Sequence, residues 1–243
     1  MDDCNVEAVL NITTAPGSDG LAVLKRFHNA ASDRFYTCMW MDWRDIAVPG
    51  FWVRTVQRLE QFVQAGGVGL KLWKDLGLSV RDSSGGLLRI DDERLAPLFD
   101  KAAELGVFVM FHTADPEAFF QPVDRYNERF EELVAHPDWS FCGSALTQQQ
   151  VLAQRNRVFQ RHPKTQFLCA HMAEQSENLA SLAALLDDHP NVSVDLSARV
   201  NELGRQPFTA RRFLIKYAGR ILFGTDLPVD QSVYRSSFRF LET

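Results

Sequence analysis

The sequence predicts an α/β fold, a TIM-type (β/α)8 barrel in which strands 2 to 8 are present and the first strand is missing. Apolar runs of strand length alternate with segments whose apolar residues recur at helical spacing. This alternation is typical of a parallel sheet covered by helices. Four of the apolar runs end in a histidine or an aspartate. Because parallel strands bring their carboxyl ends to one rim, we expect these polar side chains to gather at the mouth of a barrel.

The clearest of these runs lies within GVFVMFHTADP, residues 106–116. Five apolar residues without alternation indicate a strand that is buried on both faces, and His112 stands at its carboxyl end. His171, Asp195 and Asp226 end three further runs in the same way.

The other elements follow in order along the chain. Strands are expected at residues 5–13, 35–43, 68–73, 107–111, 165–170, 191–196 and 220–224. Helices are expected at residues 21–31, 52–65, 147–161, within 176–188 and at 209–218, with one more between Asp91, as its cap, and Gly106, where it ends. Residues 115–147 are rich in aromatic residues, proline and charge, and are expected to form an insertion over the rim with a short helix at 125–135.

Seven strands leave a choice between a barrel and an open sheet. An open, doubly wound sheet tolerates seven strands, but it usually carries a glycine-rich phosphate loop, and neither GxGxxG nor GxxxxGK[ST] occurs. A complete barrel needs eight strands and about 250 residues. We therefore expect one domain over residues 1–243 that lacks the first strand and whose last helix is shortened or absent.

Composition narrows the class of partner. The net charge is −5 and no basic stripe is present, which argues against nucleic acid or an anionic membrane and favours a small-molecule substrate. The four cysteines are far apart and form no CxxC pair, as expected of reduced core residues in a cytoplasmic protein. No signal peptide or 18-residue apolar span is evident. The sequence leaves a homo-oligomer open.

Four strand-end residues suit a divalent metal. Imidazole and carboxylate are ligands of zinc, with manganese and iron as alternatives. Each residue alone has a plainer interpretation, because a strand-end histidine is often only hydrogen-bonded and a lysine often reaches past the core to solvent. Their common position at one rim favours a metal site. The four residues are Lys71, His112, His171 and Asp226. Asp195 remains open, since it either pairs with Arg199 or caps a turn.

At this point the chain resembles a known family. The segments GLKLWKDLG, VMFHTADP, FLCAHMAE, VSVDLSAR and LFGTDLP, in this order, resemble the amidohydrolase superfamily, and most of all its amidohydrolase-related branch. The resemblance implies a barrel whose rim holds one or two divalent ions. It implies that His112 is a ligand, that His171 is a ligand or polarises the substrate, and that Asp226 is both ligand and general base. Lys71 matches a position that is a carbamylated, metal-bridging lysine in some members and no ligand in others.

One departure from the family pattern concerns the first strand. Members carry an H-x-H pair at its end that supplies two metal ligands, and no H-x-H occurs in this sequence. We therefore expect the sequence to be truncated before strand 2, so that the metal site belongs to a longer parent protein.

Three functions follow. The first is a metal-dependent hydrolase in which a metal-activated water cleaves an amide, lactone or ester, with Asp226 and His171 as catalytic residues. The second is a non-oxidative decarboxylase of the same fold, and the third is a non-catalytic barrel fragment. We assign substrate contacts to Trp73, Lys74 and Arg199. Aromatic residues expected either to form an apolar wall for a ring substrate or to pack in the core are Trp40, Trp43, Trp73, Phe119 and Phe120.

Overall fold

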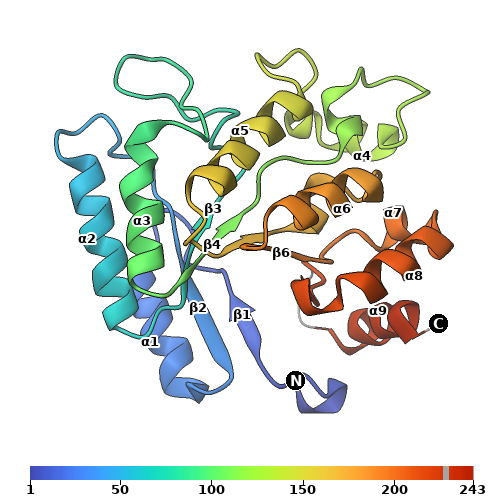
Figure 1. Ribbon diagram of the computed structural model, residues 1–243, viewed down its shortest axis with the longest axis horizontal. Helices are drawn as coiled ribbons and strands as arrows, with labels where there is room; N and C mark the ends of the chain where they lie inside the picture. The colour runs from blue at the N-terminus through green and yellow to red at the C-terminus, as the bar shows by residue number, and fades with distance from the viewer. Residues whose placement is uncertain (227–229, 243) are drawn as a thin grey trace.

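The computed structural model describes residues 1–226 and 230–242 and contains a curved sheet of seven parallel strands. The strands lie side by side in chain order, and each is hydrogen-bonded to the next one along the chain. The sheet curls with helices outside it, as in an incomplete TIM barrel (Figure 1), which confirms the predicted fold class. The strands are β1 Val9–Asn11, β2 Phe35–Trp40, β3 Gly69–Leu72, β4 Phe108–Phe111, β5 Phe167–Cys169, β6 Val192–Asp195 and β7 Ile221–Leu222.

The helices surround the sheet because each carries one apolar face. On α2, for example, Phe51, Leu59 and Phe62 are buried at helical spacing. Figure 1 shows α1, α2 and α3 together at one end of the sheet and α7, α8 and α9 at the other. The helices are α1 Gly20–Ala31, α2 Phe51–Gln64, α3 Ala96–Glu104, α4 Phe130–Ala135, α5 Gln148–Arg161, α6 Leu179–Asp188, α7 Val200–Gly204, α8 Pro207–Lys216 and α9 Gln231–Glu242.

Several local predictions need correction. Asp91 does not cap the helix before Gly106: the Asp92 side chain accepts a hydrogen bond from the Arg94 amide at the start of a 3₁₀ turn, Glu93–Leu95, that leads into α3. The Asp91 carboxylate instead binds Arg89 and Arg157. Of the two alternatives for the last helix, absence is wrong, because α9 is present, and α7 has no counterpart among the predicted helices.

Strand register decides which side chains face the inside of the curved sheet. Lys71 pairs with Met110, and Met110 pairs with Leu168. Met110 and Leu168 form a small inner cluster with Ala170, against which Leu10, Ile12 and Phe108 pack. Because side chains alternate between the faces of a strand, Lys71 points to this inner side, and His112, two residues after Met110, does too. A larger core fills the space between the sheet and the helices.

The two outer strands leave the barrel open. β1 and β7 stand at opposite ends of the strand order, and within the described ranges each pairs with one neighbour. A groove of about 430 Å³ is lined by residues of both strands, among them Leu10 and Leu222, together with Tyr36 and Phe108.

The cysteines differ in exposure. All four thiols are free; Cys38 and Cys169 are buried, whereas Cys4 is half-buried and Cys142 is exposed. The expectation of core cysteines is therefore wrong for Cys142, which lies within residues 115–147. None of the described helices has the length and apolar character needed to cross a membrane.

Gly67, between α2 and β3, is a position where only glycine fits. A Cβ added there would lie 2.1 Å from a ring carbon of Phe62 and 2.8 Å from the Phe62 carbonyl oxygen. We expect Gly67→Ala to lower the free energy of unfolding by about 1–3 kcal/mol, measured by urea titration, because α2 must shift to accept the methyl group. Gly219→Ala is the control, since no atom lies within 4 Å of its added Cβ. Equal losses in both variants would contradict this account.

Candidate active site

Six of the seven predicted site residues line one cavity of about 560 Å³. They are Trp73, Lys74, His112, His171, Arg199 and Asp226. They come from strand ends far apart in the sequence, and the parallel sheet brings them together because its carboxyl ends meet at one rim. The seventh, Lys71, lies beneath this cavity on β3.

The two histidines are in contact at the bottom of the cavity. Their ring centroids are 4.5 Å apart, and both side chains are almost fully buried. Asp226 lies next to them, with its Oδ2 atom 3.8 Å from Nε2 of His171. The ring of Trp73 packs edge-on against His112 at 4.5 Å. Two imidazoles and one carboxylate therefore meet within a few ångströms, and the partly exposed Asp226 faces the cavity.

Hydrogen bonds fix the orientation of His171. Its backbone amide donates to Oδ1 of Asp195 at 2.9 Å, and its Nδ1 lies 2.9 Å from the carbonyl oxygen of Ser197. A carbonyl only accepts, so this network assigns the proton to Nδ1 and leaves Nε2 as the lone-pair nitrogen that faces Asp226. Asp195 also accepts from the Ser197 amide at 3.0 Å. Of the two open alternatives, Asp195 thus takes the role of capping a turn.

His112 is buried in the neutral state. Neither ring nitrogen makes a hydrogen bond, although Oδ1 of Asp115 lies 3.7 Å from Nε2. Burial lowers the pKa of the imidazole from 6.5 to about 3, and the positive charges of His171 and Lys71 act in the same direction against the effect of Asp115. A neutral imidazole with unpartnered nitrogens is the form in which histidine binds a metal.

Lys71 does not reach solvent, so the plainer interpretation of this residue is wrong. Its side chain is buried inside the sheet, with Nζ 5.6 Å from the centroid of the Trp73 ring. Burial lowers the pKa of its amine, while Asp195, Glu174 and Asp226 raise it. The lysine therefore contributes to the electrostatics beneath the two histidines.

Cationic side chains approach the cavity from its rim. Lys74 forms an ion pair with Asp115, and Arg199 donates from Nη1 to the carbonyl oxygen of Ala198 at 2.8 Å. Nε of Arg199 is buried and makes no hydrogen bond. Arg129, which the sequence did not single out, also lines the cavity and pairs with Glu202.

The aromatic residues separate into different groups. Trp73 and Phe119 line the 560 Å³ cavity, which agrees with the expectation that some of these rings form an apolar wall. Trp43 belongs to the core, and Trp40 packs on Trp73 at 5.1 Å. Phe120 lines a different and larger cavity, where it stacks on Phe141 at 5.0 Å.

The donor set fits a divalent cation in type. Two buried imidazoles and a carboxylate are the ligands that zinc, manganese and iron accept, and the nitrogens of His112 have no other partner. Within residues 1–226 and 230–242, no three His, Cys, Asp or Glu side chains are already arranged to hold a metal ion. The described residues thus supply ligand types but not a preformed shell.

The segment that follows β5 has an unusual backbone. His171, Met172, Ala173 and Glu174 all have φ between 54° and 56°, in the left-handed region. None is glycine, and such residues cost roughly 1–2 kcal/mol each in this conformation. Consecutive left-handed residues beside a candidate ligand indicate stored strain at a functional position.

Two residues that the sequence reasoning missed hold this segment. Arg155 on α5 and Glu174 have side chains without solvent exposure, and Nη1 of Arg155 lies 3.2 Å from Oε2 of Glu174. Burial raises the pKa of the Glu174 carboxyl, and Arg155 opposes this rise. A signal was present, because Arg155 sits four residues from both Val151 and Phe159 on the apolar face of a helix.

The sequence of this chain matches one family of known proteins. The profile of the amidohydrolase family matches residues 10–238. The chain belongs to this family. The finding confirms the resemblance noted in the sequence, and the family consists of metal-dependent enzymes. No curated protein matches the sequence of this chain.

Solved structures share the fold of this chain at low sequence identity. An uncharacterised TIM-barrel protein from Bordetella bronchiseptica is 16% identical, with a TM-score of 0.64 over 100% of this chain and 73% of its own. A dihydroxybenzoic acid decarboxylase from a Polaromonas species, with bound manganese and 2-nitroresorcinol, is 16% identical, with a TM-score of 0.57 over 98% and 78%. A probable 2-pyrone-4,6-dicarboxylic acid hydrolase from Acinetobacter baumannii, with citric acid, is 12% identical, with a TM-score of 0.59 over 99% and 77%.

The lowered pKa of His112 predicts a pH dependence of stability. Below pH 6.5 the unfolded chain binds a proton at this residue while the folded chain does not until about pH 3. As the pH is lowered through this window, the free energy of unfolding should fall by up to about 1.4 kcal/mol per pH unit. Urea titrations of metal-free protein from pH 7 to pH 4 measure it. His112→Gln should flatten the slope, and a wild-type slope in this variant would refute the assignment.

Within the left-handed segment, a substitution to glycine should stabilise the protein, whereas within a helix it usually destabilises. Ala173→Gly should raise the free energy of unfolding by about 1 kcal/mol, because glycine adopts positive φ without steric cost. Ala102→Gly, at a buried position within α3, should lower it by about 1 kcal/mol. Thermal unfolding of both variants checks the pair. Destabilisation by both changes would contradict strain at Ala173.

Proposed function

We propose that this protein is a metal-dependent hydrolase that cleaves a C–N or C–O bond, in an amide, lactone or ester, of a small molecule that carries a carboxylate. The observation that carries the proposal is the contact of two buried imidazoles, His112 and His171, beside the Asp226 carboxylate. His112, His171 and Asp226 would hold the cation, zinc in the first instance and otherwise manganese or iron. Such a cation supplies the Lewis acidity that makes water a nucleophile at neutral pH.

Asp226 is the proposed general base. Its carboxylate is half exposed and lies against the lone-pair nitrogen of His171, so it has access to water in the cavity. It would take a proton from the attacking water and return it to the leaving group. His171 is held by Asp195 and Ser197 with its proton on Nδ1, so the lone pair of Nε2 is turned toward Asp226 and would bind the cation.

The proposed substrate contacts are Trp73, Lys74 and Arg199. The buried, unpartnered Nε of Arg199 is a donor in need of an acceptor, and a carboxylate satisfies a guanidinium best. The rings of Trp73 and Phe119 offer an apolar wall to a planar or ring-shaped substrate. Lys74 already forms an ion pair with Asp115, so its proposed role is to partly neutralise this carboxylate where the substrate enters.

Non-oxidative decarboxylation is the second candidate. It is favoured by the fold shared with the dihydroxybenzoic acid decarboxylase, which was solved with manganese. The same cation would then bind an aromatic acid in place of activating water. The third candidate is a barrel fragment without catalysis, which the sequence suggests because it contains no H-x-H pair.

Metal binding separates the first two candidates from the third. Equilibrium dialysis with Zn²⁺ or Mn²⁺ should give stoichiometric binding to the wild-type chain. His112→Ala and His171→Ala should weaken the affinity at least about tenfold, because each removes a ligand. His136→Ala, at an exposed histidine, is the matched control. Wild-type protein that binds neither metal would select the non-catalytic candidate.

Activity assays separate hydrolysis from decarboxylation. The metal-loaded chain is tested on a panel of carboxylate-bearing lactones, amides and esters, and on hydroxybenzoates with detection of carbon dioxide. Asp226→Asn should lower the turnover of the active class by about 10²–10⁴-fold, because it removes the general base. Asp188→Asn, at an exposed position on α6, should have no effect. Retention of full activity in Asp226→Asn would exclude it as the base.

A further inference from the structure

His171 begins a backbone segment that does not hold its own shape. Four consecutive residues without glycine, His171–Glu174, occupy the left-handed region. Residues in such a conformation persist only where surrounding contacts determine it. The orientation of His171 therefore depends on whatever holds the segment after it.

Arg155 provides the strongest of these contacts. Its Nη1 donates to the carbonyl oxygen of Ala173 at 2.9 Å and lies 3.2 Å from Oε2 of Glu174. The aliphatic and guanidinium parts of Arg155 are fully buried, and its guanidinium carbon lies 5.4 Å from the centroid of the Phe159 ring. One side chain of α5 thus holds both the backbone and the end of the strained segment.

Glu174 extends the connection to the other histidine. Its Oε1 accepts a hydrogen bond from the backbone amide of Thr113 at 3.2 Å, and Thr113 directly follows His112. The carboxylate therefore joins the end of β5, at His171, to the end of β4, at His112. Glu174 thus helps to fix the spacing between His112 and His171 from the side of the sheet that does not face the 560 Å³ cavity.

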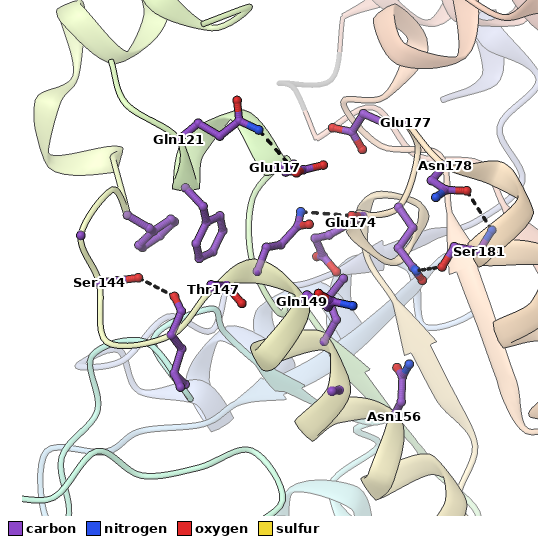
Figure 2. Close-up of a pocket in the computed structure, with 18 residues that line it drawn as sticks. Glu117, Gln121, Ser144, Thr147, Gln149, Asn156, Glu174, Glu177, Asn178 and Ser181 are labelled. Atoms are coloured by element: carbon purple, nitrogen blue, oxygen red, sulfur yellow. Dashed lines mark hydrogen bonds between the residues drawn. The ribbon is translucent and has the colours of Figure 1, made fainter. Parts of the chain in front are cut away.

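Glu174 lies outside the candidate active site. It does not line the 560 Å³ cavity, and instead it lines the larger cavity of about 790 Å³. Figure 2 shows Glu174 among the residues of this larger cavity. Its backbone carbonyl oxygen accepts a hydrogen bond from the side-chain amide of Gln148 at 3.4 Å. The same Gln148 amide donates to the carbonyl oxygen of Asp115 at 2.9 Å. Glu174 is thus not among the residues that would touch a substrate bound in the 560 Å³ cavity.

We propose that Arg155 and Glu174 are positioning residues, whose buried pair holds the left-handed segment and thereby sets His171 against His112 for metal binding. The inference rests on the proposed function only in the role it gives to the two histidines. The positions of the side chains behind them determine the tautomer and the direction of the lone pair that a metal meets.

The energetics of buried charges allow positioning to be separated from stability. Removing one partner of a buried pair is strongly destabilising, whereas replacing both by uncharged groups of similar size is often neutral. Glu174→Gln keeps an acceptor for the Thr113 amide but leaves Arg155 without a counter-ion. The double variant Arg155→Met/Glu174→Gln removes both charges, although it also loses the hydrogen bond to the Ala173 carbonyl.

The first measurement uses Co²⁺ as the probe, with affinity followed by its visible absorption. We expect Arg155→Met, Glu174→Gln and the double variant to weaken Co²⁺ binding by about 10–100-fold. The midpoint of thermal unfolding should fall in the single variants and recover in the double variant. Arg157→Met is the matched control, because Arg157 lies on the same helix and pairs with Asp91 instead. It should keep wild-type affinity.

The second measurement needs no metal. Two-dimensional ¹⁵N spectra of metal-free protein, assigned with His171→Gln, report which imidazole nitrogen carries the proton. Wild-type His171 should be protonated at Nδ1 alone, and the three variants should show a mixture of tautomers. Wild-type affinity or an unchanged His171 tautomer in the double variant would overturn the proposal, and so would an equal loss of affinity in Arg157→Met. A wild-type chain that binds no Co²⁺ but whose variants lose the tautomer would refute the proposed function and leave the positioning role standing.

Discussion

The register of the parallel sheet is the constraint on which the candidate site depends. Lys71, Met110 and Leu168 lie opposite one another on adjacent strands, so the residues that follow them emerge at one mouth. His112, His171 and Asp226 meet there although they are separated by more than fifty residues along the chain. A shift of one residue in any of these strands would turn its side chains to the opposite face and separate the group.

Burial then gives the site its chemistry. The two imidazoles lie on apolar neighbours and above a buried lysine, and this environment keeps His112 uncharged. Asp226, in contrast, is half exposed and faces the cavity. The neutral imidazole nitrogens at the bottom of the cavity and the solvated carboxylate beside them suit a cation that binds protein ligands on one side and water on the other. Arg199 and the rings of Trp73 and Phe119 line the same cavity.

The strands and the strand-end residues could be predicted because apolar runs and their polar ends are local features of the sequence. His112 and His171 follow such runs directly, and parallel pairing does the rest. The cap at Asp92 rather than Asp91 could not be predicted, because neighbouring aspartates offer the same carboxylate and the choice depends on Arg157, a distant partner. The left-handed segment was hidden for a different reason, since it contains no glycine and is held by Arg155 through tertiary contacts. The burial of Lys71 likewise depends on the curvature of the sheet, which no single strand encodes.

The distribution of the thiols allows residues 115–147 to be labelled chemically at one position. Burial raises the pKa of Cys38 and of Cys169 to about 12, so neither forms a thiolate at neutral pH. Cys142 is exposed and directly follows Phe141, a residue that lines both cavities. Once the half-buried Cys4 is replaced by serine, a maleimide fluorophore would attach at Cys142 alone and report from the partition between the two cavities.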